Sequence, residues 1–446
     1  MWKIVFGRKL FEELQQFLFN TVPRENGCFL LANHYSTETG KNVVLITDII
    51  RADENSWNYS TEHSLGPSSS FINRSVVLAD EQNSGLIFVH THPGTFHPPR
   101  FSPVDEKSNR KIFANLAQIL PDRPLGSLVV TQESMCGVVY HRGKIQAVSS
   151  FVITGQTITE FGPNGESSSG VRPTFDRQVR AIGEQNQKKL QGMTVTVVGA
   201  GGVGSAVAVQ LARMGVKKLR LIDRDAIDET NVSRVYGSTR HDLRKAKVDV
   251  LKKHIASFSK TEVEALKVDI TKVDHVSDLI DSDVIFGCTD NLTSRAILND
   301  ISIQYSIPLI DVGTRIHLEK DKSIDQAIIK VQVVTPDNAC LWCTGTLDGK
   351  IILQESLSAE ERKKLAEEGY YEDVQKQPSI ISMTTMAASM AVIKLLSLVG
   401  VFGKEYDART QFELKGGFVV SDTPEIKSNC ICRKRRGIGE KRRIVN

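Results

Sequence analysis

The stretch Thr-Val-Thr-Val-Val-Gly-Ala-Gly-Gly-Val-Gly, residues 194–204, decides the fold of the region around it. Its first five residues have the β-branched, apolar composition of a buried parallel strand, and a glycine-rich turn follows at once. A helix is predicted over residues 205–214 and a second strand over residues 218–222, which ends at Asp223. Together they predict a βαβ nucleotide-binding unit of the Rossmann type.

The glycine turn predicts contacts to a phosphate group. Gly199, Gly201, Gly202 and Gly204 let the backbone approach the phosphate closely. The following helix directs its first amide groups and the positive end of its dipole at the anion. Asp223 is placed to accept ribose hydroxyl groups. The alternative is a structural Rossmann-like turn that binds no nucleotide.

Length and composition predict several domains. A chain of 446 residues with an apolar content of 40% is long enough for two or three domains, each with its own core. A stretch rich in glycine, serine and proline predicts a linker at residues 153–172. It separates an N-terminal module, residues 1–152, from a second domain, residues 173–432, and a basic tail, residues 433–446.

Local patterns place the secondary structure. In the N-terminal module, strands are predicted at residues 28–32, 43–50, 75–78, 86–90 and 128–131, and helices at residues 9–19 and 105–120. After the linker, helices and strands alternate at βαβ spacing as far as residue 310, which predicts an α/β domain. A strand is expected at residues 283–287 and a long helix at residues 382–398.

The positive charge is concentrated at the end of the chain. Residues 433–443 hold seven basic residues and one acidic residue, so they exceed the whole net charge of +4 and leave the rest slightly acidic. A nucleic-acid partner is therefore not expected, and the tail is expected to be solvated and disordered. Seven cysteines, four of them in close pairs, indicate metal ligation in a reducing, cytoplasmic compartment rather than disulfides.

Neither a leader nor a membrane span is expected. The N-terminal residues reach Glu12 and Glu13 without the long apolar run of a signal peptide. Residues 193–216 and 380–402 are apolar, but the first stretch contains the glycine turn and the second carries Lys394. Both are interpreted as buried elements of the fold.

A second group of polar residues lies in the N-terminal module. In His90-Thr-His92-Pro93, which follows an apolar strand, both imidazoles project from one side of an extended backbone. Ser102-Pro-Val-Asp105 opens a predicted helix, with Ser102 as its N-cap and Asp105 one turn on. Two histidines, a carboxylate and an open position describe a catalytic zinc site. The alternative is a pair of hydrogen-bonded strand histidines and an ordinary helix cap.

These residues resemble the JAMM (MPN/JAB) zinc isopeptidases, whose signature is a glutamate followed by His-x-His-Pro and Ser-x-x-Asp. The resemblance implies an α+β, metalloprotease-like domain over residues 1–152, with Glu25 as general acid/base and Ser102 supporting the tetrahedral oxyanion. The implied zinc ligands are His90, His92 and Asp105. Residues 93–101 make the spacing two residues longer than is usual in the family, which leaves loop shape and substrate access open.

Further polar residues follow Asp223 and point to ATP rather than to NAD. They are Asp225, Asn231, Arg234, Lys247, Asp290, Asn291 and Arg295. A dehydrogenase has no need for this series. An adenylating enzyme needs cations along the triphosphate, an acid for Mg²⁺ and an α-phosphate open to attack by a carboxylate.

These motifs resemble the ThiF/MoeB/ubiquitin-activating-enzyme family over roughly residues 175–432, which implies a Rossmann-like adenylation domain with a mainly parallel sheet. The resemblance implies that Asp223 and Asp225 hold the ribose. Phosphate contacts are implied for Asn231, Arg234 and Lys247, with Asn291 and Arg295 also in the nucleotide site. Catalytic roles are implied for Arg177, Arg234, Lys247 and Asp290, of which Asp290 binds Mg²⁺. The alternative for Arg234 and Lys247 is a solvated helix face.

Arg177 and the cysteines carry two further implications. Arg177 matches the family arginine that reaches into the active site of the partner subunit, so a homodimer is implied. The pairs Cys340-Leu-Trp-Cys343 and Cys430-Ile-Cys432 match the family's structural zinc site, the alternative being buried thiols without a metal. Residues 344–429 contain no cysteine, which predicts acyl-adenylate formation with thiol transfer left to a separate conjugating partner. A variant would use a zinc-pair cysteine as the acceptor.

The chain as a whole resembles fused JAMM and activating-enzyme proteins of bacterial ubiquitin-like systems, with ATP, Mg²⁺ and Zn²⁺ as cofactors. The resemblance implies adenylation of the C-terminal carboxylate of a ubiquitin-like or sulfur-carrier protein. It also implies cleavage of an amide at that terminus, as precursor processing or deconjugation. A role in antiphage defence is implied only by this resemblance. Two alternatives stay open: adenylation of a peptide or a tRNA base, and an N-terminal module that grips the modifier without a metal.

Overall fold

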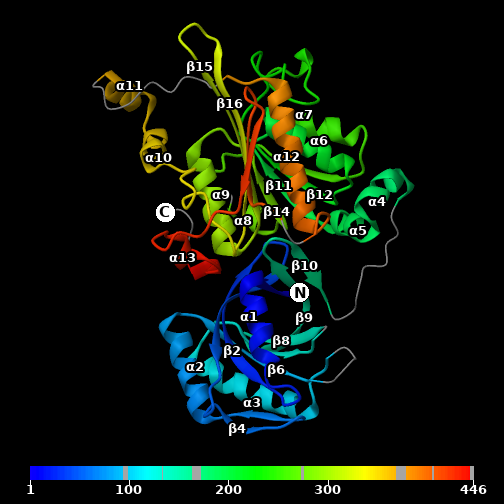
Figure 1. The fold of residues 1–446 in the computed structure, drawn as a ribbon, viewed down its shortest axis with the longest axis vertical. Helices are drawn as coiled ribbons and strands as arrows, with labels where there is room; N and C mark the ends of the chain where they lie inside the picture. The colour runs from blue at the N-terminus through cyan, green and yellow to red at the C-terminus, as the bar shows by residue number, and fades with distance from the viewer. Residues whose placement is uncertain are drawn as a thin grey trace. The chain divides into compact units, whose positions relative to one another are not determined.

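The computed structural model describes residues 1–93, 99–132, 134–162, 172–272, 276–367, 378–403 and 406–441. The chain divides into two compact units (Figure 1). Unit 1 comprises Met1–Ser168, Gln304–Ser306 and Arg436–Arg443, and unit 2 comprises Ser169–Ile303, Ile307–Arg435 and Ile444–Asn446.

Unit 1 is built around a closed sheet. Its strands, in spatial order, are β1 (Trp2–Gly7), β3 (Asn42–Arg51), β2 (Gly27–Ser36), β6 (Gly85–Thr91), β7 (Leu125–Val130), β8 (Met135–His141), β9 (Lys144–Thr154) and β10 (Ile158–Phe161). Because β1 also pairs with β9, the sheet closes into a barrel. A separate hairpin is formed by β4 (Trp57–Ser60) and β5 (Leu65–Pro67).

Helices cover both sides of this sheet, which explains why residues 28–32 of β2 are all apolar. Leu30 packs in the cluster that includes Leu14 of α1 (Arg8–Leu18). Phe29 faces the other way and packs with Phe71 of α2 (Ser69–Glu81) and Phe113 of α3 (Pro103–Ile119). Successive residues of a strand point to opposite faces, so a strand buried on both faces loses the polar alternation.

One predicted strand of this module is wrong. Residues 75–78 form part of α2, whose buried residues Phe71, Ser75, Val76 and Ala79 recur with helical spacing. The local run of β-branched residues suggested a strand, but the longer helical period decides the conformation. Unit 1 contains both helices and strands, as expected, and the JAB/MPN type of its fold stays a prediction.

Unit 2 contains an open eight-stranded sheet. Its strands, in spatial order, are β13 (Glu262–Leu266), β12 (Lys218–Ile222), β11 (Thr194–Val198), β14 (Val284–Gly287), β15 (Leu309–Leu318), β16 (Ile324–Val334), β17 (Arg409–Glu413) and β18 (Phe418–Asp422). The first five are parallel and the last three extend the sheet with antiparallel pairs. The Rossmann-like, mainly parallel arrangement predicted from residues 194–222 is confirmed.

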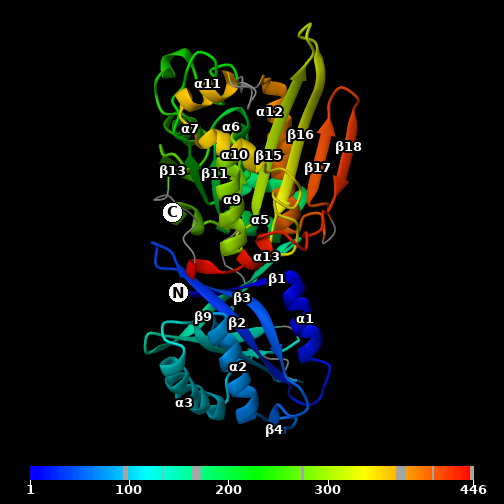
Figure 2. The same cartoon turned by 90° about the vertical axis from the view of Figure 1, so that its left-hand side faces the viewer.

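Helices cover both faces of the unit 2 sheet. They are α4 (Asp176–Ile182), α5 (Glu184–Gly192), α6 (Gly202–Arg213), α7 (Lys247–Ala256), α8 (Val276–Ile280), α9 (Leu292–Tyr305), α10 (Gly349–Ser356), α11 (Ala359–Glu367), α12 (Ile381–Val399) and α13 (Cys432–Arg435). Figures 1 and 2 show α6 and α12 side by side on one face of the sheet and α9 on the other. Helix α12 is long and apolar enough to span a membrane, but the core helices of globular proteins often are too. In this structure α12 packs against α6, β15 and β16.

The two segments expected to be irregular contain regular structure. Strand β10 lies within the predicted linker, of which residues 163–171 fall outside the described residues. The expected solvated state does not hold for the described part of the tail. The side chains of Asn33 and Gln304 donate hydrogen bonds to the carbonyl oxygens of Gly437 (2.9 Å) and Gly439 (2.7 Å).

Gly201, the N-cap of α6, and Gly204, in its first turn, are expected to respond very differently to substitution by alanine. A Cβ atom on Gly204 would lie 1.7 Å from the carbonyl oxygen of Gly199, whereas a Cβ atom on Gly201 would meet nothing within 4 Å. We expect Gly204→Ala to destabilise unit 2 by more than about 2 kcal/mol and Gly201→Ala by less than about 0.5 kcal/mol. Differential scanning calorimetry of both variants measures this, and equal melting temperatures would contradict the close approach.

Candidate functional site

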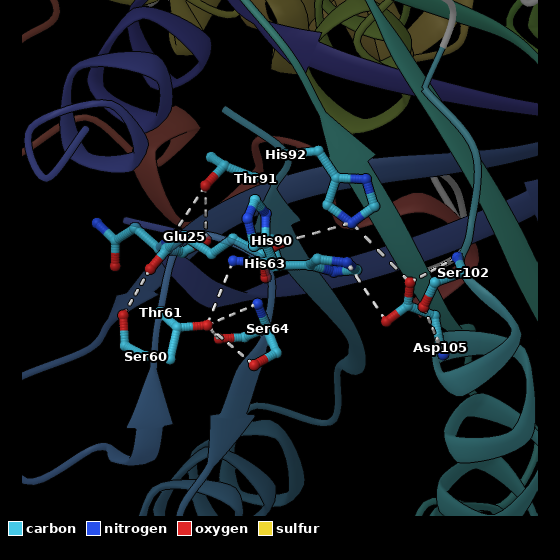
Figure 3. Close-up of polar contacts among 11 residues, drawn as sticks. Glu25, Ser60, Thr61, His63, Ser64, His90, Thr91, His92, Ser102 and Asp105 are labelled. Carbon is cyan, nitrogen blue, oxygen red and sulfur yellow. Dashed lines mark hydrogen bonds and ion pairs between the residues drawn. The ribbon is translucent and has the colours of Figure 1, made fainter. Parts of the chain in front are cut away.

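The pairing of β2 with β6 brings Glu25 to the two histidines. These strands are antiparallel, with Gly27 opposite His90, and the amide of Thr91 donates to the carbonyl oxygen of Asn26 at 2.9 Å. The next pair in this register is Glu25 and His92. Oε1 of Glu25 accordingly lies 3.9 Å from Nε2 of His92 (Figure 3).

The first turn of α3 supplies the third group of this cluster. Ser102 is the N-cap, as predicted: its hydroxyl accepts from the amide of Asp105 at 3.2 Å, and its own amide donates to Oδ2 of Asp105 at 2.8 Å. This capping box fixes the Asp105 carboxylate. Its oxygens lie 3.6 Å from Nε2 of His90 and 3.9 Å from Nε2 of His92.

The three expected zinc ligands therefore meet. One ligand atom from each of His90, His92 and Asp105 lies within 4.8 Å of the others. His90 is 4% exposed, and within the described part of the chain neither of its buried ring nitrogens has a partner at hydrogen-bond distance, Nε2 lying 3.6 Å from Asp105. An orphaned buried polar atom is costly, and a metal ion is one partner that removes the cost.

The protonation states suit a cation at the same place. Burial lowers the pKa of His92, which favours the neutral imidazole that metals bind. Burial opposes ionisation of Asp105, but the contact with His90 and the hydrogen bonds from Ser102 outweigh it and hold the pKa well below its usual range. Burial raises the pKa of Glu25. The donor set fits zinc.

The glycine turn of unit 2 joins three strand ends. Gly199 has a φ of +93°, a left-handed conformation that favours glycine, and a Cβ there would lie 2.5 Å from the carbonyl oxygen of Cys288. The amide of Ala200 donates to Oδ2 of Asp223 at 2.7 Å. Asp290 is exposed just beyond Cys288, at the carboxyl end of β14. The predicted turn, ribose acid and magnesium acid therefore lie at one edge of the sheet.

Two predicted phosphate-binding cations lie near this edge, each with partners inside the protein. Nζ of Lys247 lies 2.8 Å from Oδ2 of Asp225 and 3.9 Å from Oδ2 of Asp223. Arg234 donates to the carbonyl oxygen of Thr230 at 2.7 Å, and its Cδ would lie 3.3 Å from a Cβ on Gly202. Lys247 is only 8% exposed, so the predicted solvated helix face does not describe it.

The other predicted residues of the nucleotide site divide into exposed and internally bonded ones. Arg177 of α4 is exposed. The carboxamide oxygen of Asn231 accepts from the amide of Asp228 at 3.0 Å, and that of Asn291 accepts from the amide of Ser294 at 2.8 Å. Arg295 points inward and donates to the carbonyl oxygens of Thr289 (3.2 Å) and Val312 (3.1 Å). The nucleotide contacts of these residues stay predictions.

The four paired cysteines form a cluster of the size expected for zinc. Sulfur–sulfur distances are 3.7 Å for Cys340–Cys343, 3.7 Å for Cys340–Cys430 and 3.6 Å for Cys343–Cys432. A tetrahedron with Zn–S bonds of about 2.3 Å has edges of about 3.8 Å, whereas a disulfide needs about 2.05 Å. None of these four described cysteines forms a disulfide, and their spacing fits a structural zinc ion.

Two polar residues near these sites belong to no recognisable sequence motif. Glu355 of α10 accepts hydrogen bonds from Leu292 and Thr293 at the start of α9. Asp311 of β15 is 1% exposed and lies 3.6 Å from Arg295. Both belong to segments far from the motifs in sequence, and only the fold brings them close.

Comparison with known proteins identifies the second domain. Residues 175–434 match the ThiF family. Since this match covers more than half of the 446 residues, the chain belongs to the ThiF family. Residues 1–174 lie outside the match, so the zinc-isopeptidase resemblance of the N-terminal module rests on its own cluster of polar residues.

Curated relatives match only part of this chain. It is 35% identical over 139 residues to the tRNA threonylcarbamoyladenosine dehydratase of Bacillus subtilis, which covers 30% of this chain and 54% of that protein. It is 32% identical over 133 residues to the sulfur carrier protein ThiS adenylyltransferase of the same organism, covering 29% and 39%. Adenylyltransferase and sulfurtransferase MOCS3 of Aedes aegypti is 30% identical over 148 residues, covering 32% and 34%. The chain thus spans about a third to a half of these relatives.

Among solved structures, E. coli MccB with MccA-N7isoASN is similar at 18% identity and a TM-score of 0.49. The match covers 59% of this chain and 75% of that one.

The two clusters predict two zinc ions per chain. Cys340→Ser removes a ligand from one cluster and His90→Ala from the other, so each variant is expected to retain one zinc ion. Elemental mass spectrometry of the purified chains measures the content. His317→Ala, an exposed histidine outside both clusters, is the control and should retain two. Two zinc ions in His90→Ala would remove the metal assignment from the histidine cluster.

Proposed function

We propose that the ThiF-family domain adenylates the C-terminal carboxylate of a ubiquitin-like or sulfur-carrier protein and releases pyrophosphate. The observation that carries this proposal is the junction of the glycine turn with the strand end that bears Asp290. ATP bound along the turn has its phosphates beside that acid. The names of two relatives, a ThiS adenylyltransferase and an adenylyltransferase and sulfurtransferase, support this class of substrate.

In this proposal the acidic residues bind the ribose and the basic residues bind the phosphates. Asp223 and Asp225 orient the ribose through its hydroxyls, while Arg234 and Lys247 provide positive charge for the phosphates. Lys247 exchanges its contact with Asp225 for a phosphate oxygen. Asp290 would hold Mg²⁺, which neutralises phosphate charge when bound. The carboxylate of the carrier attacks the α-phosphorus, forms the new P–O bond and displaces pyrophosphate.

The acceptor thiol belongs to a separate protein. Residues 344–429 contain no cysteine. Cys288 lies next to the glycine turn, but burial raises its pKa far above the usual range, so it is a poor nucleophile. We also propose a homodimer, in which the exposed Arg177 of one subunit completes the site of the other.

ATP–pyrophosphate exchange tests the adenylation proposal. With a carrier protein ending in Gly-Gly, exchange should depend on the carrier, and Asp290→Ala should reduce it by on the order of 100-fold because the metal carboxylate is lost. Asp325→Ala, which removes an exposed acid of β16, is the matched control and should leave the rate unchanged. Exchange that depends on a short peptide or on RNA would favour the alternative substrates. Full activity of Asp290→Ala would overturn the proposal.

We further propose that unit 1 is a zinc-dependent peptidase acting on an amide at the same carrier terminus. Support comes from the convergence of His90, His92 and Asp105 and from the buried Glu25 beside them. A zinc ion held by these ligands would supply an activated water. Glu25, beside His92, would accept a proton from the attacking water and pass it to the leaving amine. Ser102, at the start of α3, lies on the side of Asp105 and supports the oxyanion.

Glu25→Gln separates catalysis from metal binding. This variant keeps the ligand set, so it should retain zinc while cleavage of a carrier–reporter amide fusion falls by on the order of 100-fold. Cleavage is measured by gel electrophoresis and mass spectrometry of the products. Glu62→Gln is a control at a nearby exposed acid. Wild-type protein that binds the fusion but never cleaves it would instead establish a scaffold.

A further inference from the structure

We propose that Glu355 is a positioning residue of the adenylation site, which fixes the turn that carries Asp290. Oε1 of Glu355 accepts from the amide of Leu292 at 2.9 Å. Oε2 accepts from the amide of Thr293 at 2.8 Å and from the Thr293 hydroxyl at 2.6 Å. The inference rests on the proposed adenylation function, because Asp290 matters only if it serves the nucleotide.

These bonds occupy the start of α9. The first amides of a helix have no partner within the helix and are usually bonded by the N-cap residue or by water. Here Asn291, the residue before the helix, accepts from Ser294 alone. The two preceding amides, of Leu292 and Thr293, donate to the carboxylate of Glu355, more than 60 residues further along the chain. The negative charge also faces the positive end of the helix dipole.

The turn is held on its other side as well. Arg295 donates from Nε to the carbonyl oxygen of Thr289 at 3.2 Å and from Nη2 to that of Val312 at 3.1 Å. Its guanidinium lies 3.6 Å from the buried carboxylate of Asp311, which keeps it directed into the sheet. Thr289 is therefore tied to β15 and residues 292–293 are tied to α10.

Asp290 lies between these two attachments and is itself exposed. Residues that do not touch a metal ion can still orient the carboxylate that would bind it. Loss of the Glu355 bonds would free the C-terminal side of the turn, and small displacements of such a group cost on the order of tenfold to a hundredfold in rate. Glu355 acts through Asp290 and touches no reacting atom in this scheme.

The test uses Glu355→Gln in the full chain. Glutamine has the same shape but only one acceptor oxygen, so its NH₂ group faces the amide of either Leu292 or Thr293 and cannot accept from it. We expect carrier-dependent ATP–pyrophosphate exchange to fall about tenfold and the Mg²⁺ concentration for half-maximal exchange to rise severalfold. In calorimetric titrations, the enhancement of ATP binding by Mg²⁺ should weaken by a similar factor, while binding without Mg²⁺ stays unchanged.

A matched control exists on the neighbouring helix. Glu361 accepts from the amide of Ser358 at 2.8 Å at the start of α11, a capping contact of the same kind that does not touch the Asp290 turn. Glutamine keeps an acceptor oxygen for that single amide, so Glu361→Gln should leave the Mg²⁺ dependence at the wild-type value. Equal Mg²⁺ dependence in Glu355→Gln and wild type, or an equal loss in Glu361→Gln, would overturn the proposal.

The titration of ATP distinguishes the two proposals from each other. If wild-type protein binds ATP in a Mg²⁺-dependent way that Glu355→Gln weakens, but supports no exchange with a carrier, the positioning role stands and carrier adenylation fails. If wild-type protein shows no Mg²⁺-dependent ATP binding, both fail. If exchange is carrier-dependent and Glu355→Gln retains wild-type Mg²⁺ dependence, only the positioning role fails.

Discussion

The parallel register of β12, β11 and β14 is the constraint on which the ThiF-family site depends. Val198 is paired with Ile222 on one side and with Gly287 on the other, so the three strands end at the same level. The residues that follow each end must then emerge side by side. This brings Asp223 and the turn that bears Asp290 to the glycine turn, although they are distant in sequence. The strand register sets the positions of Asp223 and of the turn that bears Asp290, and helix caps and neighbouring side chains then adjust them.

Unit 1 reaches its polar cluster by a different route. Its antiparallel β2–β6 pair places Glu25 opposite His92 through cross-strand register, and a helix cap supplies Asp105. A buried polar group without a hydrogen-bond partner costs about 1–3 kcal/mol, and among the described residues Nδ1 of His90 has none, while its Nε2 lies 3.6 Å from Asp105. Selection for stability alone would favour an apolar residue at this position of the core strand. The proposed zinc ion would give the imidazole a partner and so account for a histidine there.

Local patterns predicted the parts of this structure that depend on neighbouring residues. The strands at 194–198 and 218–222 have the predicted bounds, because each is a short apolar run ended by turn residues. The strand predicted at residues 75–78 was wrong, because a pattern of only four residues is the same for a strand and for a helix segment that contains β-branched residues. The closed sheet of unit 1 depends on pairing between β1 and β9, which are more than 130 residues apart, and no local period encodes it. The contacts of Glu355 and Asp311 depend on long-range folding in the same way.

For Lys247, the motif predicted that the residue lies near the glycine turn but did not predict which side chains it contacts. The resemblance places a cation on the phosphates, and in the structure its ammonium group lies between Asp223 and Asp225. A lysine that is 8% exposed needs a countercharge, because an unpaired ammonium group in that position would lose its hydration without compensation. Burial raises the pKa of Asp223, while the charge of Lys247 favours its ionised form. The two acids therefore hold the ammonium group of Lys247 close to the glycine turn, so the position of the cation depends on the same strand end that carries Asp223.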